Sequence, residues 1–498
     1  MHLKIQRRQG RDYLSVVQSY RQDGKVKTRT IETIGYADAY ADRFEDPVAH
    51  FRAYVEQLNR GAIEHRQPIE LSFGSDDTID AEVRPTARLG AAIALGCLDA
   101  LGVSTFFRAR AGRDGAPTHA GRIFEMLACE RMMHATSKRE SWAARASFPR
   151  TCDFSYEDVY RALAYFATEA PALDRCTAAR WSAIGGEPGR DRAFLICGSY
   201  AFPVDGGSER ASIAVAIDGD GMPMGYHDMK GRLTPEAFRE AVDELKERLG
   251  LDRAVAVAGG LRDLEPTIAE LASTGDGFVL YQRDFRNLPE LAAWADDDEG
   301  YAQIGEDVFM KTRTATRRLP DGGRIPVKEV MLRGGGYATS HRHAVLVSSE
   351  LDLGGAAIMQ MYRELWRQAE PFQPLEADFS SMPYPTPSGD HIRAHFAVCY
   401  ASFFALRMLR WKMGWKHNAA ETADALMRMD GLHLQQNYYL FSYRTPTTDD
   451  IEAVVGIDQA RRLRTRAELR SIPGTVATSF VQQSKCYEQI DCVSHRRT

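Results

Sequence analysis

The sequence predicts a mixed protein of the α+β or α/β class, in which a sheet is flanked by helices. Short apolar runs of strand type alternate with amphipathic helical segments over the second half of the chain. An N-terminal β-hairpin is expected before them, followed by a helical domain. The chain has 498 residues, of which 44% are hydrophobic and 10% aromatic, so it can fill the cores of several domains.

Charge and cysteine usage limit the function classes. The net charge of −5 gives no overall attraction to nucleic acid, so DNA binding would depend on local basic surfaces. Eight cysteines without a C-x-x-C pair fit reduced thiols and a cytoplasmic protein, associated with the nucleoid when DNA is bound. The longest apolar run, 396–406, is shorter than the ~18 residues of a membrane span. We therefore expect neither secretion nor contact with a membrane.

A hairpin and a helix are expected at the start of the chain. Two β-rich runs, 13–20 and 26–34, are joined by R-Q-D-G-K, and Asp-Gly between such runs is a strong hairpin signal. Asp46 and Pro47 suit the N-cap and first turn of a helix. Residues 1–30 hold eight basic and two acidic side chains, a net charge of +6. This is a candidate phosphate-binding surface, the alternative being a solvated hairpin whose cations discourage strand pairing.

The middle of the chain reads as helices and then as a mixed sheet. Helical spacing covers 89–101, 120–133 and 156–168, and this pattern ends near Pro171. Strands are then expected at 193–202, 213–217, 222–229, 254–258 and 278–282, with helices at 236–249 and 265–272. The order β-β-β-α-β-α-β is that of an RNase H-like core.

The last third of the chain adds an insertion and further helices. The piece 311–333 of a β-rich insertion holds seven basic and two acidic side chains, a net charge of +5. A helix with an apolar row from Tyr362 to Ala369 should end or kink at Pro371. The predicted domains are a hairpin and helix at 1–70, a helical domain at 85–171, a core at 190–480 with the insertion at about 285–340, and a tail at 481–498.

Three places in the core resemble the DDE transposases of the insertion-sequence-four superfamily. That family has its first Asp in a setting like D-V-T-x-x-x-F, and C-G-S-Y-A-F has Gly198 there. Its second Asp lies in a setting like V-A-D-x-G-L, and V-A-G-G-L has Gly259 there. Its last helix carries Tyr, Arg, Glu and Lys. Tyr362 matches the Tyr, but Ala369 stands at the Glu and Glu376 at the Lys.

The resemblance spans nearly the whole chain and implies a DNA-binding frame without the ancestral chemistry. In the family, three carboxylates hold two Mg²⁺ ions that stabilise the attacking and leaving oxygens. Glycine and alanine supply no oxygen ligand, so no catalytic residue, metal or other cofactor is expected. The resemblance implies a transposase-like protein that is catalytically inactive and acts as a regulator, a competitor for transposon ends or a relic.

Two alternatives stay open. Displaced acids, Asp205, Asp263 and Glu370, would restore a Mg²⁺ site and make the protein an active transposase or nuclease. A displacement of one residue on a helix, however, rotates a side chain by about 100°. In the second alternative the protein is an interaction module without a nucleic-acid function, and its basic surfaces only keep it soluble.

The expected partner is double-stranded DNA, with inverted-repeat ends as the candidate target and a homodimer as the candidate assembly. The residues expected to contact DNA are Lys4, Arg7, Arg8, Lys25, Lys27, Arg29, Arg313, Arg317, Arg318, Arg363, Trp366 and Arg367. They come from the hairpin, the insertion and the helix that bears Tyr362.

Overall fold

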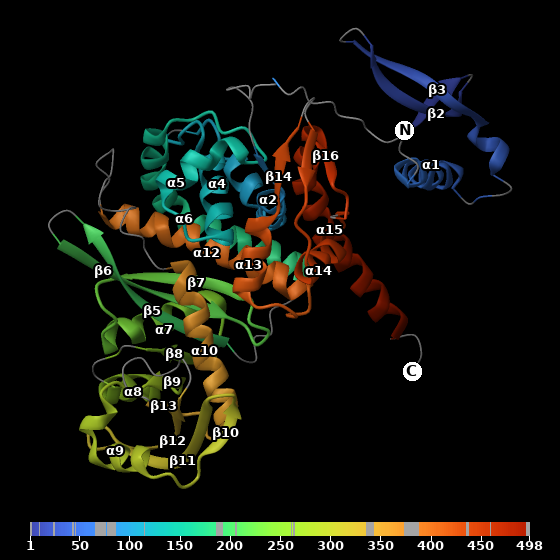
Figure 1. Ribbon diagram of the computed structural model, residues 1–498. Coiled ribbons are helices and arrows are strands. Elements are labelled where there is room, and N and C mark those ends of the chain that lie inside the picture. The colour runs from blue at the N-terminus through green and yellow to red at the C-terminus, as the bar shows by residue number, and fades with distance from the viewer. Residues whose placement is uncertain are drawn as a thin grey trace. The chain divides into compact units, whose positions relative to one another are not determined.

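The computed structural model divides into two compact units, Met1–Ile79 and Asp80–Thr498, and each is described by itself. The structure describes residues 2–8, 10–22, 25–41, 44, 46–64, 76, 86–113, 115–185, 193–204, 207–259, 261, 264–334, 343–372, 388–434, 438–458 and 460–494. Side chains are described for these residues except 19–27, 29, 31, 57, 58, 60–64, 204, 364–371, 388 and 482–494. The predicted mixed α+β class is confirmed (Figure 1).

The N-terminal unit is a small antiparallel sheet with a helix. Its elements are β1 (His2–Arg8), β2 (Arg11–Gln22), β3 (Lys25–Tyr36), η1 (Ala37–Tyr40) and α1 (Pro47–Glu64). The strands pair in the order β1-β2-β3, so β2 and β3 form the predicted hairpin and β1 adds a third strand. The carboxylate of Asp46 accepts hydrogen bonds from the backbone N–H groups of Val48 and Ala49, which confirms the predicted N-cap.

The C-terminal unit is built on a long mixed sheet. Among the described residues its strand order is β10-β11-β12-β13-β9-β8-β5-β6-β7. The strands are β5 (Ala193–Val204), β6 (Gly207–Ile217), β7 (Pro223–Lys230), β8 (Ala254–Ala258), β9 (Gly277–Tyr281), β10 (Ala302–Gly305), β11 (Val308–Arg318), β12 (Arg324–Arg333) and β13 (His343–Ser348). β5, β8 and β9 run parallel, whereas the neighbours on both sides pair antiparallel. The basic insertion thus extends the core sheet through β13, which the sequence did not reveal.

Helices cover both faces of this sheet (Figure 1). They are α7 (Pro235–Leu249), α8 (Leu264–Ser273) and, after η3 (Phe285–Asn287), α9 (Pro289–Asp296), with α10 (Gly355–Phe372) and α12 (Ser388–Lys412) on the opposite face. Leu195 and Cys197 of β5 lie in the core beneath α7 and α8. Ile196 and Phe202 lie in the core shared with α10 and α12. This alternation along one strand separates two cores that meet only through the sheet.

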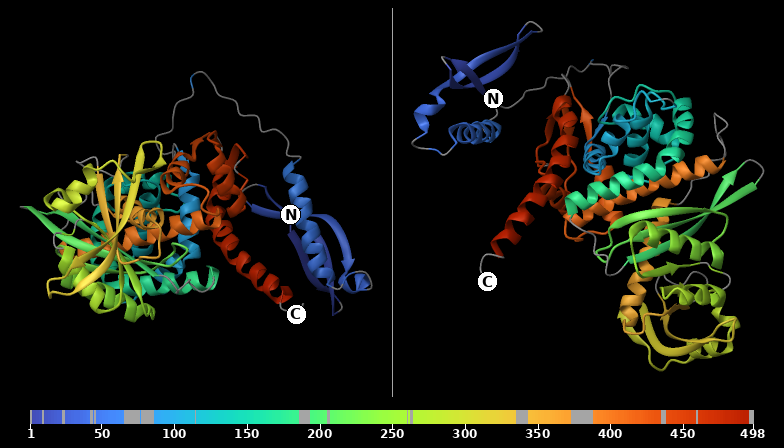
Figure 2. Two further views of the ribbon diagram at one scale, coloured as in Figure 1. Left: turned by 90° about the horizontal axis from the view of Figure 1, so that it is seen from below. Right: turned by 180° about the vertical axis from the view of Figure 1, so that it is seen from behind.

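A layer of helices packs on the far side of α12 (Figure 2). It contains α2 (Leu89–Ala100), α3 (Val103–Arg108), α4 (Ala120–Met133), α5 (Lys138–Ala143), η2 (Ala144–Ser147), α6 (Tyr156–Gly185), α13 (Ala419–Arg428), α14 (Pro446–Val455) and α15 (Arg466–Ser494). A second sheet, in the order β16-β15-β14-β4, joins β4 (Thr86–Arg88), β14 (Asp430–His433), β15 (Tyr438–Phe441) and β16 (Leu463–Thr465). The region expected as a separate helical domain, 85–171, therefore shares its core with the end of the chain.

Two expected boundaries differ from the structure. The helix expected to stop near Pro171 continues as α6 to Gly185. Pro171 is exposed, while Leu173 and Trp181 in the following turns are buried. Burial of those two side chains offsets the roughly 3 kcal/mol that a proline costs inside a helix. The expected tail at 481–498 is helical in its backbone as far as Ser494.

The arginine-rich segment with Arg461, Arg462, Arg464, Arg466 and Arg470 is only partly helical. Arg461 and Arg462 precede β16, and Arg464 lies in that strand. Only from Arg466 does the chain become helical, as α15. Arg464 is buried, because strand pairing with β15 carries it into the structure.

α12 is the central buried helix of the C-terminal unit. Within the described residues, Gly389–Lys412 is long and apolar enough to cross a membrane, but 94% of its apolar window is buried inside the structure. It nevertheless carries histidines. Burial lowers the pKa of His391 to about 2, and it also lowers the pKa of His395, whose Nε2 lies 3.0 Å from the carbonyl oxygen of Phe372. Both side chains are neutral in the folded protein.

We expect the free energy of unfolding to fall as the pH drops below about 6.5. In that range unfolded His391 binds a proton, whereas the folded side chain, with its pKa near 2, does not. The stabilisation is therefore complete above 6.5 and lost towards lower pH, at about 1.4 kcal/mol per pH unit for one such group. His391→Gln should reduce this slope in denaturant titrations between pH 7 and 5, and the same change at exposed His134 should not. An unchanged slope for His391→Gln would contradict the assignment.

Candidate functional site

The positions that the sequence singled out meet where the pairing of β5 with β8 ends. These strands are parallel neighbours, and their last paired residues are Cys197 and Ala258. Gly198, in the middle of β5, and Gly259, directly after β8, come next, so they lie side by side at two central strands of the sheet. α10, which carries Ala369, packs against both strands. The side chain of Ala369 lies outside the described residues.

A tyrosine ring covers Gly198. Residues two apart on a strand point to the same face, so Tyr200 lies on the side of Gly198. A Cβ atom at position 198 would be 2.8 Å from the Tyr200 hydroxyl oxygen and 3.1 Å from its ring carbons Cε2 and Cζ. The ring is held 6.3 Å from that of Phe396 in α12, and burial raises the pKa of its hydroxyl. The space for a carboxylate at position 198 is therefore occupied.

The other face of the same edge is open. Ser199 is one residue from Gly198 and points to the opposite face, into a hollow of about 320 Å³. The polar residues that line the hollow are Ser199, Arg210, Arg232, Thr234, Thr267 and Arg283. Gly259 forms part of its wall, and none of the described lining residues is acidic. This edge thus carries positive charge on the face that is accessible. This could not be predicted from the sequence, because Arg210 lies on β6 whereas Arg232 and Arg283 follow other strands.

The described carboxylates near Gly198 and Gly259 do not form a candidate metal site. Among the described residues, no three His, Cys, Asp or Glu side chains are grouped so that they could hold a metal ion. Asp205, Asp263 and the side chain of Glu370 lie outside the described residues. Asp218 lies at the opposite edge, after β6, where it accepts hydrogen bonds from the N–H groups of Asp220 and Met222. Burial raises the pKa of the Asp218 carboxyl, which closes a turn.

Two of the expected DNA-contacting cations share a face of the N-terminal sheet. Lys4 and Arg8 are exposed and lie on the same side of β1, and the guanidinium of Arg8 lies 4.3 Å from the centre of the Tyr13 ring. The Tyr13 ring in turn contacts Tyr36 edge-on at 5.0 Å. Arg7 points to the opposite face. The structure does not describe the side chains of the other three expected cations, Lys25, Lys27 and Arg29 on β3.

In the insertion, a buried acid engages two of the expected cations. Arg313 lies 2.7 Å from one carboxylate oxygen of Glu329, and Arg317 lies 2.7 Å from the other. Glu329 is only 2% exposed, so both arginines serve to neutralise it. Arg318 is exposed beside the turn and faces Arg324 across the hairpin. This pair places two exposed cations near the tip of the hairpin, where Asp321 lies in the turn.

α10 contributes both a core face and the remaining candidates. Tyr362 is buried and stacks on Tyr281 at 5.9 Å, as its helical spacing predicted. Arg363 is half-buried, and the helix ends at Phe372, next to Pro371, as predicted. The described residues do not include the side chains of Trp366 and Arg367, or Glu376.

Residues 3–69 match the family model of the IS1634 family transposase N-terminal domain. The matched stretch contains β1 to α1, and therefore the face with Lys4 and Arg8. The match supports a transposase family and a transposase-like function for the chain. A search among curated proteins finds no match.

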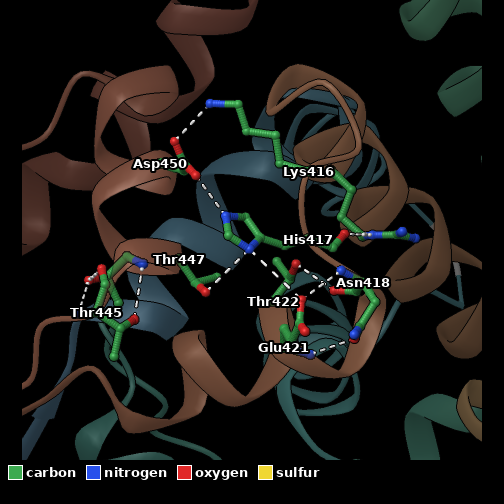
Figure 3. A network of polar contacts seen from close by, with 10 residues as sticks. Lys416, His417, Asn418, Glu421, Thr422, Thr445, Thr447 and Asp450 are labelled. Carbon is green, nitrogen blue, oxygen red and sulfur yellow. Dashed lines mark hydrogen bonds and ion pairs between the residues drawn. The ribbon is translucent and has the colours of Figure 1, made fainter. Parts of the chain in front are cut away.

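A second polar cluster, which sequence analysis missed, joins the start of α13 to α14 (Figure 3). His417 Nε2 lies 2.7 Å from Asp450, which also pairs with Lys416 at 3.1 Å, and these contacts lower the pKa of the Asp450 carboxyl. The hydroxyl of Thr447 lies 3.4 Å from Nδ1 of the same histidine. A hydroxyl activated by a base lies within about 3.2 Å. The cluster ties the segment before α13 to the first turns of α14.

Restoring an acid at position 198 should destabilise the protein. We expect Gly198→Asp to lower the free energy of unfolding by about 1–3 kcal/mol, because the new side chain must displace the Tyr200 ring. In a Tyr200→Ala background, the same substitution should cost less, since the ring is gone. Denaturant titration of the four proteins in this double-mutant cycle measures the coupling. Equal costs in the two backgrounds would contradict the role of Tyr200.

Proposed function

We propose that this chain is a transposase-derived DNA-binding protein that no longer carries out strand transfer. The observation that carries the proposal is the adjacency of Gly198 and Gly259 where the pairing of β5 with β8 ends. In the resembled family these places hold two of the three metal-binding acids. Glycine supplies no ligand, and Tyr200 fills the space over Gly198. Mg²⁺ would be required only if displaced acids replaced the lost ones.

The topology supports a descent from the insertion-sequence-four superfamily. The order β7-β6-β5-β8-β9, with β5, β8 and β9 parallel and the first two strands antiparallel, is the arrangement expected of an RNase H-like core. α10 lies on this sheet where the family has the helix with its last acid. We propose that the frame is inherited and its chemistry lost.

DNA contact is assigned first to the N-terminal sheet. Lys4 and Arg8 present two cations beside the Tyr13 ring, and this combination of charge and aromatic surface suits a phosphate backbone. The family match over residues 3–69 covers this face. The tip of the insertion at Arg318 is the second candidate contact, and Arg363 on α10 the third. The proposed target is double-stranded DNA such as an inverted-repeat end, bound by a homodimer.

The cytoplasm, or the nucleoid within it, is the proposed place of action. The described cysteines are free thiols. Cys176 is partly buried, and the others are buried: Cys97, Cys129, Cys152, Cys197 and Cys399. Free buried thiols are typical of a reducing compartment, where DNA is accessible to the protein.

Incubation with DNA should give no cleavage or joining products. We expect the full chain to leave labelled duplexes with candidate terminal repeats intact in Mg²⁺ and in Mn²⁺, because Gly198 and Gly259 cannot bind either ion. Products on a sequencing gel would contradict the proposal. If such products disappeared in the variant Asp205→Ala, Asp263→Ala and Glu370→Ala, the displaced acids would be the catalytic ones.

Binding to duplex DNA should weaken with salt. Combined Lys4→Ala and Arg8→Ala should reduce the slope of log affinity against log salt by about 1.8, since each phosphate contact contributes roughly 0.9. Arg52→Ala, an exposed arginine of α1 outside the set expected to contact DNA, should leave the slope nearly unchanged. Fluorescence anisotropy between 50 and 200 mM salt, about the range where such contacts are resolved, measures this slope. Absence of duplex binding would favour a protein-interaction module instead.

A further inference from the structure

We propose that the arginine-lined hollow at the edge of β5 and β8 binds the phosphate group of a nucleotide. The nucleotide is either free or the phosphorylated end of a DNA strand, and the two sources share the same chemistry. The inference about a DNA end rests on the proposed function, whereas the inference about a free nucleotide does not. No bond is formed or broken in this site, because it holds an anion by charge and hydrogen bonds alone.

Three arginines from separate parts of the fold line the hollow. Arg210 lies on β6, Arg232 precedes α7 and Arg283 follows β9. All three are exposed, and the described part of the chain contains no ion pair of Arg210 or Arg232. Arg283 lies 3.7 Å from Asp284, but both side chains are more than half exposed, so this pair contributes little in water.

The start of α7 adds donors and a favourable dipole. Thr234 is the N-cap of this 15-residue helix, and its hydroxyl accepts the N–H of Ala237 at 3.2 Å. The positive end of the helix therefore lies at the wall of the hollow and favours an anion there. Ser199 and Thr267 line the same space and carry hydroxyl groups. Arginine guanidinium groups, hydroxyl groups and a helix N-terminus together are a typical combination for phosphate recognition.

The size of the hollow suits one nucleotide. Its volume of about 320 Å³ lies at the lower end of the range of small-molecule sites, roughly 300–1,000 Å³. A duplex is too wide to enter it. Gly259 leaves backbone without a side chain in the wall, so a ligand can approach closely there. A strand end or a mononucleotide therefore fits better than the continuous backbone of a double helix.

Calorimetric titration of the full chain with deoxyadenosine monophosphate tests the proposal. Binding is expected for this nucleotide and not for deoxyadenosine, which lacks the phosphate. The triple variant Arg210→Ala, Arg232→Ala and Arg283→Ala should bind at least about 100-fold more weakly, given that each charged fork contributes about tenfold. Arg175→Ala, an exposed arginine of α6, should bind as the unaltered protein does. Equal affinity for the nucleoside, or unaltered binding by the triple variant, would overturn the proposal.

A second experiment, a competition assay, identifies the source of the phosphate. Single-stranded oligonucleotides with and without a 5′-phosphate are compared in competition with the mononucleotide. A preference for the phosphorylated strand that disappears in the triple variant assigns the site to DNA ends, and no preference assigns it to free nucleotides. If the triple variant keeps duplex binding and nucleotide binding is absent in every protein, this inference fails while the proposed function stands. If the protein binds nucleotides but not duplex DNA, the proposed function fails while this inference stands.

Discussion

The burial of α12 is the constraint on which the C-terminal unit depends. A helix of this length and apolarity must be covered on all sides, and here the sheet with β7 covers one side while α2, α4 and α6 cover the other. Its polar groups then need partners inside the protein. Near its end, Arg410 donates from Nε to the carbonyl oxygen of His417 and lies over the Trp415 ring. The helix layer and the sheet are thereby fixed to each other.

That constraint explains why the two faces of one strand edge differ so strongly. The face with Gly198 and Tyr200 lies towards α12, so its side chains are packed against Phe396. The face with Ser199 lies beyond the ends of α7 and α8, where the hollow opens. Neighbouring residues of β5 therefore lie in different environments: Gly198 faces a filled, apolar region, and Ser199 faces a polar, cationic one.

Strong local patterns made much of the fold predictable. The helix at 120–133 and the strand at 254–258 were expected with the bounds that the structure has, because helical spacing and a short continuous apolar run are local signals. Pro171 misled the prediction, since the burial that keeps α6 helical comes from other segments. The pairing of β13 with β9 is equally non-local.

The candidate site was predictable only in part, for the same reason. The resemblance to a known family pointed to Gly198 and Gly259, because each belongs to a motif beside a recognisable strand. Nothing in the sequence pairs Arg210 with Arg283, which are brought together by the sheet order alone. The sequence also gave no indication that Glu329 engages Arg313 and Arg317, since cross-strand register decides which cations remain available.

The ring of Tyr200 has an evolutionary consequence. A glycine codon can become an aspartate codon by one base change, so an acid at position 198 is a single mutation away. With the ring within 3.1 Å of the position that a Cβ atom would take, that mutation meets a steric penalty at once. An acid at position 259 would require a second, independent mutation. Tyr200 therefore selects against acidic side chains at position 198, and the opposite face of β5 stays available to another ligand.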